Sequence, residues 1–338
     1  MTANFSIQAI AHAYQIPVQP AGHHWTLAES YQFCRALTVS HYENFPVGSR
    51  LLPKAKREHV YPIYAFARIA DDFADEPRYE GCRLEWLHEW DARLLACVEG
   101  RAEDPVFIAL ADTLEKCLLP VSLFRDLLHA FKRDVTVSRY ETWHELIHSY
   151  CRYSANPVGR LILHLFDYRD EERLAQSDKI CTALQLANFW QDVSVDLQKD
   201  RVYIPIEAMQ RHQYSLNDLQ AHIYDTRLQN LMDELCQATW RHFQRGYPLL
   251  DSVRWPLNAE LRFTWMGGVR ILQQVMKNDY NVFQRPVHSK WHFARLAVRS
   301  LCNIDSAKRH YDEWFSQHRR GSSDLNQSQH PEGLEKIS

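Results

Sequence analysis

The chain has 338 residues, of which 46% are hydrophobic and 24% are charged, a composition typical of a globular protein. The formal net charge is −3 and no basic run is interleaved with aromatic residues, so nothing predicts nucleic-acid binding. The eight cysteines are scattered without a CxxC pair, which indicates reduced thiols. No stretch reaches the ~18 apolar residues that span a bilayer, and no secretion signal is visible. We therefore expect a cytoplasmic protein, with a location at the inner membrane face as the alternative.

Apolar residues recur at spacings of three and four almost throughout, which predicts an all-α protein. Residues 1–23 are expected to form a flexible lead-in and residues 24–316 a single helical domain. The polar residues 317–338 are expected to form a disordered tail. Prolines between the apolar segments mark helix boundaries. The predicted helices are 24–39, 59–76, 83–98, 105–117, 121–132, 141–155, 157–166, 171–198, 205–211, 215–244, 247–253, 256–283 and 290–315.

The predicted helix 59–76 carries a narrow polar stripe on an otherwise apolar surface. At about 100° per residue, Tyr64 and Arg68 share one arc with three aspartates. These aspartates are Asp71, Asp72 and Asp75. Such a stripe is typical of a helix that lines a polar site within apolar packing, whereas a surface helix shows one broad wet face. The alternative is a solvated acidic face, which a single DDxxD pattern does not exclude.

A second stripe lies on the predicted helix 171–198, where large apolar residues flank acids and amides. Its members are Gln185, Asn188, Asp192 and Asp196. Two facing helices with such stripes can form a metal site in a bundle core, and Mg²⁺ binds through a few carboxylates together with substrate phosphates. Arg68 and Arg201 are candidate phosphate ligands, because a guanidinium offers a bidentate fork. The two stripes predict a Mg²⁺-dependent enzyme.

Three segments resemble motifs of the squalene/phytoene synthase family, which joins prenyl diphosphates head to head. YAFARIADDFAD (64–75) is similar to Y-A-x-x-R-x-x-D-D-x-x-D, and QLANFWQDVSVDLQKDRVYIP (185–205) is similar to Q-x-x-N-x-x-x-D-x-x-x-D followed by R-x-Y-[LI]-P. YCRYSANPVGRLIL (150–163) is similar to Y-C-x-x-x-A-x-x-V-G. The resemblance covers roughly residues 25–300. It implies an isoprenoid-synthase-type helical bundle with a central apolar cavity.

The resemblance also implies roles for individual residues. Those expected to hold Mg²⁺, and through it the diphosphate, are Asp71, Asp72, Asp75, Asp192 and Asp196. Those expected to bind the diphosphate or its metals are Arg68, Gln185, Asn188, Arg201 and Tyr203. Tyr64 is expected near the reacting carbons, and Phe45 is expected to line the prenyl cavity.

Within the family, the segments 40–53 and 289–301 look most like the hydroxysqualene synthases of bacterial squalene and hopanoid pathways. These enzymes ionise presqualene diphosphate, rearrange the carbocation and quench it with water, so no NADPH is expected. His41, Tyr42 and Asn44 are candidates for placing that water. Such an enzyme would take its substrate from a presqualene diphosphate synthase.

Two departures bear on the reaction. Many relatives have Arg and Glu where this chain has Gln191 and Val195, and a site with fewer charges fits one diphosphate better than two. The alternative is a presqualene diphosphate, dehydrosqualene or phytoene synthase, which condenses two prenyl diphosphates. A second alternative is a non-catalytic helical assembly factor, and the presence of all five aspartates counts against it.

Two further patterns carry weaker signals. His144, Glu145 and His148 form HExxH, a zinc-protease signature, but we expect them on the exposed side of a helix with no third ligand nearby. The amphipathic segment 289–316 is expected to pack on the bundle, with peripheral membrane contact as the alternative.

Overall fold

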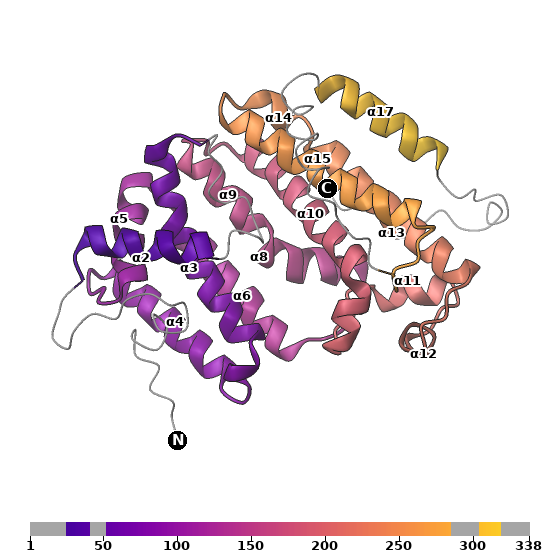
Figure 1. Ribbon diagram of the computed structural model, residues 1–338, viewed down its shortest axis with the longest axis horizontal. Helices are drawn as coiled ribbons and strands as arrows, with labels where there is room; N and C mark the ends of the chain where they lie inside the picture. Colours follow the sequence, from indigo (N-terminus) through magenta and orange to yellow (C-terminus); the bar gives the residue numbers. More distant parts are fainter. Residues whose placement is uncertain (1–24, 41–51, 285–303, 319–338) are drawn as a thin grey trace. The chain divides into compact units, whose positions relative to one another are not determined.

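The computed structural model describes residues 25–40, 52–284 and 304–318 (Figure 1). In these ranges the chain is helical and forms no β-strand, and the isolated bridge between Arg139 and Val202 is parallel. The predicted all-α class is confirmed. The predicted lead-in and nearly all of the predicted tail lie outside the described residues, so those two predictions and that of a single domain stay predictions. No helix in the described ranges is long and apolar enough to cross a membrane.

The described helices follow one another with short connections. In chain order they are α2 (Leu27–Ser40), α3 (Lys54–Asp75), the 3₁₀ helix η1 (Pro77–Tyr79), α4 (Arg83–Val98), α5 (Pro105–Cys117), α6 (Val121–Thr136), α7 (Trp143–Glu145), the π-helix η2 (Leu146–Cys151), α8 (Arg152–Ser154), α9 (Asn156–Leu165), α10 (Glu171–Gln198), α11 (Ile206–Arg211), α12 (Leu216–Gln220), α13 (Thr226–Gly246), α14 (Leu249–Ser252), α15 (Leu257–Lys277) and α17 (Ile304–Gln317). The bounds of α4, α5 and α10 coincide with the predicted ones.

The chain forms two compact units, and each is described by itself. The first unit comprises residues 1–136, 157–174 and 254–260, and the second comprises 137–156, 175–253 and 261–338. Helix α3 and its acidic residues belong to the first unit. The larger part of α10, with its acidic residues, belongs to the second.

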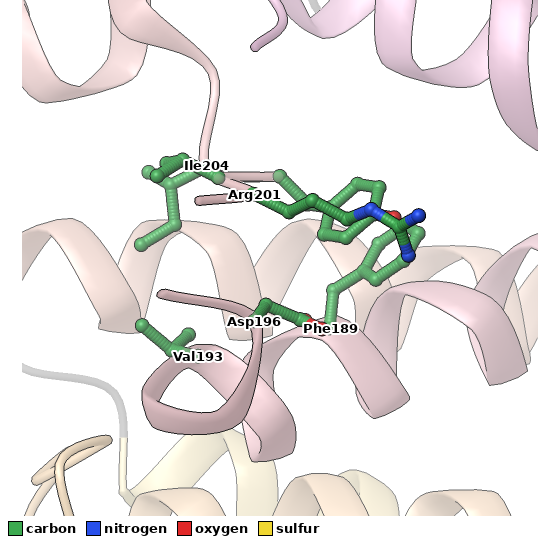
Figure 2. Close-up of a pocket in the computed structure, with 7 residues that line it drawn as sticks. Phe189, Val193, Asp196, Arg201 and Ile204 are labelled. Atoms are coloured by element: carbon green, nitrogen blue, oxygen red, sulfur yellow. The ribbon is translucent and has the colours of Figure 1, made fainter. Parts of the chain in front are cut away.

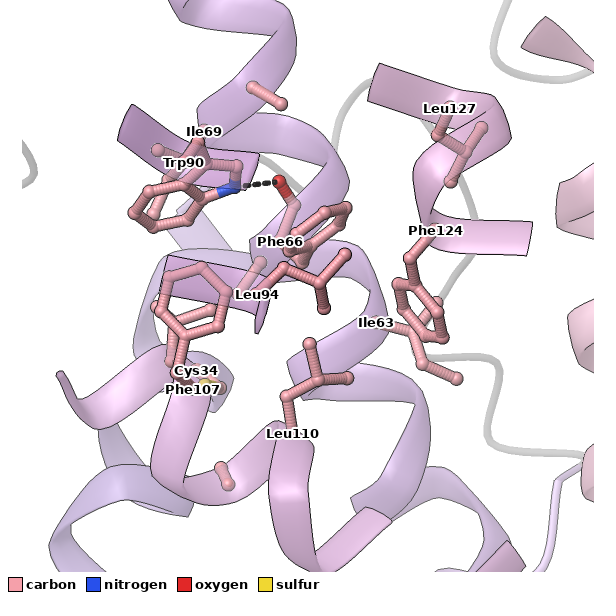
Figure 3. Packing of buried hydrophobic residues seen from close by; sticks show 14 of the residues in the cluster. Cys34, Ile63, Phe66, Ile69, Trp90, Leu94, Phe107, Leu110, Phe124 and Leu127 are labelled. Atoms are coloured by element: carbon pink, nitrogen blue, oxygen red, sulfur yellow. Dashed lines mark hydrogen bonds between the residues drawn. The ribbon is translucent and has the colours of Figure 1, made fainter. Parts of the chain in front are cut away.

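The core of the first unit is built around the apolar side of α3. Phe66 is fully buried and packs against Trp90, Phe107 and Phe124, with ring centroids 5.3–6.1 Å apart (Figure 3). The Trp90 indole Nε1–H donates to the Phe66 carbonyl at 3.2 Å, which satisfies its one polar atom. Burial of this side leaves the polar stripe of α3 facing away from the core.

A partly buried polar network ties α2 to α3 and α5 in the same unit. The Tyr31 hydroxyl lies 2.7 Å from Asp112 Oδ2, 3.0 Å from His59 Nδ1 and 3.0 Å from Thr113 Oγ1. Because each of these four atoms has a hydrogen-bond partner, the network links the three helices without a cost for desolvating them.

Tryptophans dominate the core of the second unit, where α10, α13, α15 and α17 pack. Trp190 on α10 donates from its indole N–H to Thr239 Oγ1 at 2.8 Å, and Trp265 on α15 donates to the Phe243 carbonyl at 3.0 Å. Trp240 stacks on Phe315 of α17, with centroids 4.3 Å apart. The described part of the predicted amphipathic segment therefore packs on its own unit.

Two predicted helices are interrupted in the structure, and others differ in their bounds; α3 begins at Lys54 instead of residue 59, and α15 ends at Lys277 instead of residue 283. The predicted helix 215–244 is divided into α12 and α13, because His222 has a φ of 55° and the Asp225 side chain accepts hydrogen bonds from the first backbone N–H groups of α13. The predicted helix 141–155 contains the π-helix η2, whose wider turn is not visible in a pattern of three- and four-residue spacings.

Gly246 permits the close crossing of α13 and α10, and its substitution tests this packing. A Cβ at this position would lie 2.5 Å from Ile180 Cγ1 and 2.9 Å from the Gln176 carbonyl oxygen. Because a backbone oxygen cannot easily move, we expect Gly246→Ala to cost about 1–3 kcal/mol in the free energy of unfolding, measured by thermal or urea denaturation.

Gly267 on α15 is the matched control, since a Cβ there meets nothing within 4 Å. Gly267→Ala should leave stability unchanged or raise it by up to about 1 kcal/mol through helix propensity. Equal effects of the two substitutions would contradict the packing argument.

Candidate active site

The first acidic group, Asp71, Asp72 and Asp75, lies in the last two turns of α3, in the first unit. No basic residue occupies that last turn, and Glu76 follows directly. Negative charge at a helix C-terminus opposes the helix dipole and costs about 0.3–1 kcal/mol for each exposed charge. An arrangement that lowers stability in this way indicates a functional demand.

Asp72 is the most deeply placed member of this group. It is 2% exposed, and its Oδ1 accepts a hydrogen bond from Arg68 Nη2 at 2.5 Å. Arg68 Nη1 also donates to Asp71 Oδ2 at 3.2 Å, while Arg78 lies 3.9 Å from the other oxygen of Asp72. The predicted phosphate ligand Arg68 therefore bridges two of the predicted metal ligands.

Burial raises the pKa of the Asp72 carboxyl from its ordinary 3.8 to about 7. Glu76 and Asp75 shift this pKa in the same direction by charge repulsion, and Arg78 opposes them. The close Arg68 guanidinium favours the carboxylate as well, but burial has the larger effect. Asp72 is thus a carboxyl group that a bound cation would convert to its charged form.

Tyr64 lies about two to three turns before these acids on the same stripe and is half-buried. Burial raises the pKa of its hydroxyl, Arg68 lowers it and Asp71 raises it. The hydroxyl is therefore protonated at neutral pH and close enough to sense both charges. The structure brings Tyr64, Arg68, Asp71 and Asp72 together, as the helical phasing predicted.

The second acidic group, Asp192 and Asp196, lies on α10 in the second unit, and both residues are half-buried. Asp196 lines a pocket together with Arg201 and Tyr203 (Figure 2). The remaining lining residues are Phe189, Val193, Val202 and Ile204. Three predicted site residues thus share one pocket, whose other walls are apolar. Of the two predicted amide ligands on this helix, Gln185 is half-buried and Asn188 is exposed.

The segment after α10 is held in place by its backbone. Asp200 has a φ of 54°, which turns the chain back, and the Arg201 N–H donates to the Asp196 carbonyl at 2.9 Å. The Val202 N–H donates to the Ser138 carbonyl at 2.9 Å, and the Arg139 guanidinium contacts the Asp200 side chain. This turn therefore returns Arg201 to the helix end that carries Asp196.

Aromatic stacking forms the wall of this pocket. The rings of Phe189 and Tyr203 are parallel within 7°, with centroids 3.7 Å apart. Tyr150 of the π-helix packs beside both rings, at 5.7 Å and 5.5 Å. Such a wall excludes water, and a ring face that is not covered by a neighbouring ring can interact favourably with a cation. The pocket combines a carboxylate, a guanidinium and stacked aromatic faces.

The oxygen-rich donor sets suit a hard divalent cation. Each acidic group supplies carboxylates at i and i+4, Asp71 with Asp75 and Asp192 with Asp196. In the described ranges, no three His, Cys, Asp or Glu side chains converge as a preformed metal site. The prediction that the two groups face each other stays a prediction, since they lie in different units. The predicted residues His41, Tyr42, Asn44 and Phe45 lie outside the described residues.

Arg78 and Phe189 enlarge the predicted site. Arg78 follows the end of α3, and its distance to Asp72 could not be derived from helical phasing, which stops where the helix stops. The sequence did show a basic residue, Arg78, three positions after the acidic end of α3, and this pattern could have indicated the contact. Phe189 was visible as a flank of the second stripe, but its stack on Tyr203 depends on the turn at Asp200.

Glu145, the glutamate of the HExxH pattern, makes hydrogen bonds to the backbone and to Thr142 at the start of α7. The Glu145 carboxylate accepts a hydrogen bond from the Glu141 N–H at 3.0 Å, and the Glu145 N–H donates to Thr142 Oγ1 at 3.0 Å. This arrangement caps the N-terminus of α7. Glu145 is therefore directed toward the backbone rather than toward a water on a metal.

Comparison with known proteins defines the class. The squalene/phytoene synthase family model matches residues 38–292, and the chain belongs to this family. A 15-cis-phytoene synthase from Synechocystis sp. is 32% identical over 77% of this chain and 80% of its own length. A hydroxysqualene synthase from Rhodopseudomonas palustris is 34% identical over 70% of this chain and 80% of its own length.

Solved structures agree with the helical fold. A squalene synthase from Alicyclobacillus acidocaldarius is 37% identical, with a TM-score of 0.72 over 75% of this chain and 96% of that one. A dehydrosqualene synthase solved with a ligand is 24% identical, with a TM-score of 0.73 over 84% of this chain and 98% of that one. The predicted isoprenoid-synthase fold is confirmed.

The raised pKa of Asp72 predicts a pH-dependent stability. The folded state binds the proton with a pKa near 7 and the unfolded state with a pKa of 3.8, so this carboxyl lowers stability as the pH rises between these values. In metal-free buffer, Asp72→Asn should raise the melting temperature at pH 8, by about 2–4 °C for each kcal/mol that the substitution adds to the free energy of unfolding. At pH 4.5 the rise should be much smaller.

Asp71→Asn is the matched control for this experiment. Asp71 contacts the same Arg68 guanidinium, but its side chain is 46% exposed, so we expect no comparable gain at pH 8. If Asp72→Asn lowers the melting temperature equally at both pH values, the ion pair with Arg68 outweighs the cost of burial. Scanning calorimetry at the two pH values decides the question.

Proposed function

We propose that this protein is a Mg²⁺-dependent hydroxysqualene synthase. The observation that carries the proposal is the pocket in which Asp196, Arg201 and the Phe189–Tyr203 stack meet. Its charged groups suit a metal-bound diphosphate, and its aromatic faces suit the carbocation left when that diphosphate departs. The overall change is presqualene diphosphate plus water to hydroxysqualene plus inorganic diphosphate.

Two features of the sequence favour this reaction over a condensation. Gln191 and Val195 replace an Arg and a Glu of many relatives, which leaves fewer charges for holding a second diphosphate. A relative 34% identical to this chain is a hydroxysqualene synthase. We further propose that presqualene diphosphate is handed over by the enzyme that makes it, and that the protein is cytoplasmic or peripheral to the membrane.

Different residues of this chain would bind the metal and the diphosphate. The aspartates of both acidic groups would hold Mg²⁺, with Gln185 and Asn188 as further ligands of the metal or the diphosphate. When bound, Mg²⁺ supplies Lewis-acid neutralisation of the leaving diphosphate. Arg68 and Arg201 would bind diphosphate oxygens through their guanidinium forks. Arg68 would then exchange a carboxylate partner for a phosphate.

After the C–O bond breaks, the pocket has to protect the cation. Each aromatic face can stabilise it by about 0.5–2 kcal/mol, and the apolar walls exclude water until rearrangement is complete. Tyr64 would lie near the reacting carbons as a neutral hydroxyl, consistent with the raised pKa. One water then adds to the cation and loses a proton, and His41, Tyr42 and Asn44 are the proposed residues that position it.

The main alternative is a synthase that condenses two prenyl diphosphates, and the 32% identity to a 15-cis-phytoene synthase favours it. Such an enzyme forms the new carbon–carbon bond itself; it releases one diphosphate if the product is presqualene diphosphate, and two if the product is dehydrosqualene or phytoene. A non-catalytic assembly factor is the second alternative, and it would not require the paired carboxylates.

A substrate assay separates these functions. Purified protein with Mg²⁺ and presqualene diphosphate, without NADPH, should release inorganic diphosphate and form hydroxysqualene, detected by mass spectrometry. In a parallel reaction with farnesyl or geranylgeranyl diphosphate alone, we expect no condensed product. Recovery of unchanged presqualene diphosphate together with condensation of either prenyl diphosphate would overturn the proposal in favour of the main alternative.

Removal of single carboxylates tests the roles of the two acidic groups. Asp72→Ala and Asp192→Ala should each lower kcat/KM by at least about 100-fold, because a diphosphate without its metal is a poor leaving group. Glu313→Ala, which removes an exposed carboxylate on α17, should leave the rate unchanged. Circular dichroism checks that each variant is folded. Full activity in both aspartate variants would contradict the assigned roles.

A further inference from the structure

One side chain outside the pocket holds the turn that carries Arg201. The Arg139 guanidinium donates hydrogen bonds to the backbone carbonyl of Asp200 and to its carboxylate. Arg139 Nη1 also donates to the Ser138 carbonyl at 2.8 Å. Because a guanidinium is planar and presents its N–H groups as a fixed fork, such contacts fix the orientation of their partner as well as its distance. Arg139 thus holds the residue directly before Arg201.

The segment before α7 and the segment after α10 run side by side. The Val202 N–H donates to the Ser138 carbonyl at 2.9 Å, and the bridge between Arg139 and Val202 is parallel. Further along, the Ile206 N–H donates to the Tyr140 carbonyl at 3.0 Å. The pocket-lining segment after α10 is therefore fixed at both of its ends to the same support.

Tyr140 supports the pocket from behind its aromatic wall. This residue is fully buried, and its ring lies 5.8 Å from the ring of Tyr203 at an interplanar angle of 20°. It also meets the ring of Tyr150 edge-on at 5.6 Å. Two consecutive residues, Arg139 and Tyr140, therefore support two neighbouring parts of the pocket.

The turn at Asp200 needs such support for a local reason. Its φ of 54° is a left-handed conformation, which is unfavourable for a residue with a Cβ. The Asp200 side chain is 79% exposed, so burial does not stabilise the turn. The Arg139 side chain is only 22% exposed, and hydrogen bonds from a charged donor are stronger than neutral ones. Contacts with Arg139 therefore offset the unfavourable backbone.

We propose that Arg139 is a positioning residue for Arg201. By holding the turn at Asp200 from outside the pocket, it sets the place where the Arg201 guanidinium meets a diphosphate. The inference rests on the proposed function only in taking a metal-bound diphosphate as the ligand of the pocket. A displacement of about 1 Å in a binding group can cost a large factor in rate, so a side chain that does not touch the ligand can control how it is held.

Binding of inorganic diphosphate in the presence of Mg²⁺, measured calorimetrically on the full chain, tests this role. Arg139→Gln should raise the dissociation constant about 10-fold, at the lower end of what residues that support a metal site contribute. Arg139→Lys keeps a cation that can donate to the Asp200 carbonyl, so it should recover part of the affinity. Asp200→Gly keeps that carbonyl and suits the left-handed backbone, so its loss should be smaller than that of Arg139→Gln.

A double-mutant cycle separates positioning from a general structural effect. If Arg139 acts through Arg201, adding Arg139→Gln to Arg201→Gln should change the dissociation constant by less than about twofold. Partial unfolding alone would lower the number of binding sites found by calorimetry and leave their dissociation constant unchanged. If Arg139→Gln does not fold, Arg139→Lys takes its place in the cycle, with the same criterion.

Arg169 in the first unit offers a matched control. Its guanidinium donates to the Cys117 carbonyl at 3.1 Å and lies 3.4 Å from the carboxylate of Asp167. Asp167 also has a left-handed backbone, with a φ of 66°. Arg169→Gln therefore removes the same kinds of contact from a different turn, and it should leave the dissociation constant for diphosphate unchanged.

Each outcome has a defined meaning. Unchanged binding in the Arg139 variants overturns the inference, and so do additive losses in the cycle or an equal loss in Arg169→Gln. Absence of diphosphate binding in the unsubstituted protein overturns it together with the assignment of the pocket. Diphosphate binding without formation of hydroxysqualene overturns only the proposed reaction, because the calorimetric measurement does not depend on turnover.

Discussion

The carboxylate of Asp72 is held beneath the Arg68 guanidinium at the end of α3, and this contact joins the core of the first unit to its acidic group. The same helix has to bury Phe66 and Phe73 on one side and present carboxylates on the other. Burial of one carboxylate raises its pKa and lowers the stability of the metal-free protein. A cation that binds there would relieve this cost, so metal binding would raise the stability of the helix end.

In the second unit, the turn after α10 places Arg201 beside the acidic end of that helix. The turn at Asp200 reverses the chain, and backbone hydrogen bonds to the segment around Ser138 hold it there. Arg201 and Tyr203 are adjacent to that turn, so their positions depend on the backbone rather than on long flexible side chains. The stack of Phe189 on Tyr203 completes a wall that is both rigid and apolar.

Apolar periodicity was sufficient to predict the all-α class, the bounds of α4, α5 and α10 and the polar stripes, because buried and exposed sides of a helix are determined by local spacing. The break before α13, the π-helix and the approach of Arg78 to Asp72 were decided by tertiary structure. The break before α13 depends on the left-handed backbone of His222, and the π-helix depends on a wider helical turn. The approach of Arg78 to Asp72 is a contact made beyond the end of α3. The sequence by itself determined which residues are proposed to bind a metal diphosphate. The tertiary structure decided which of them meet, because contacts between residues on different elements follow from how those elements pack.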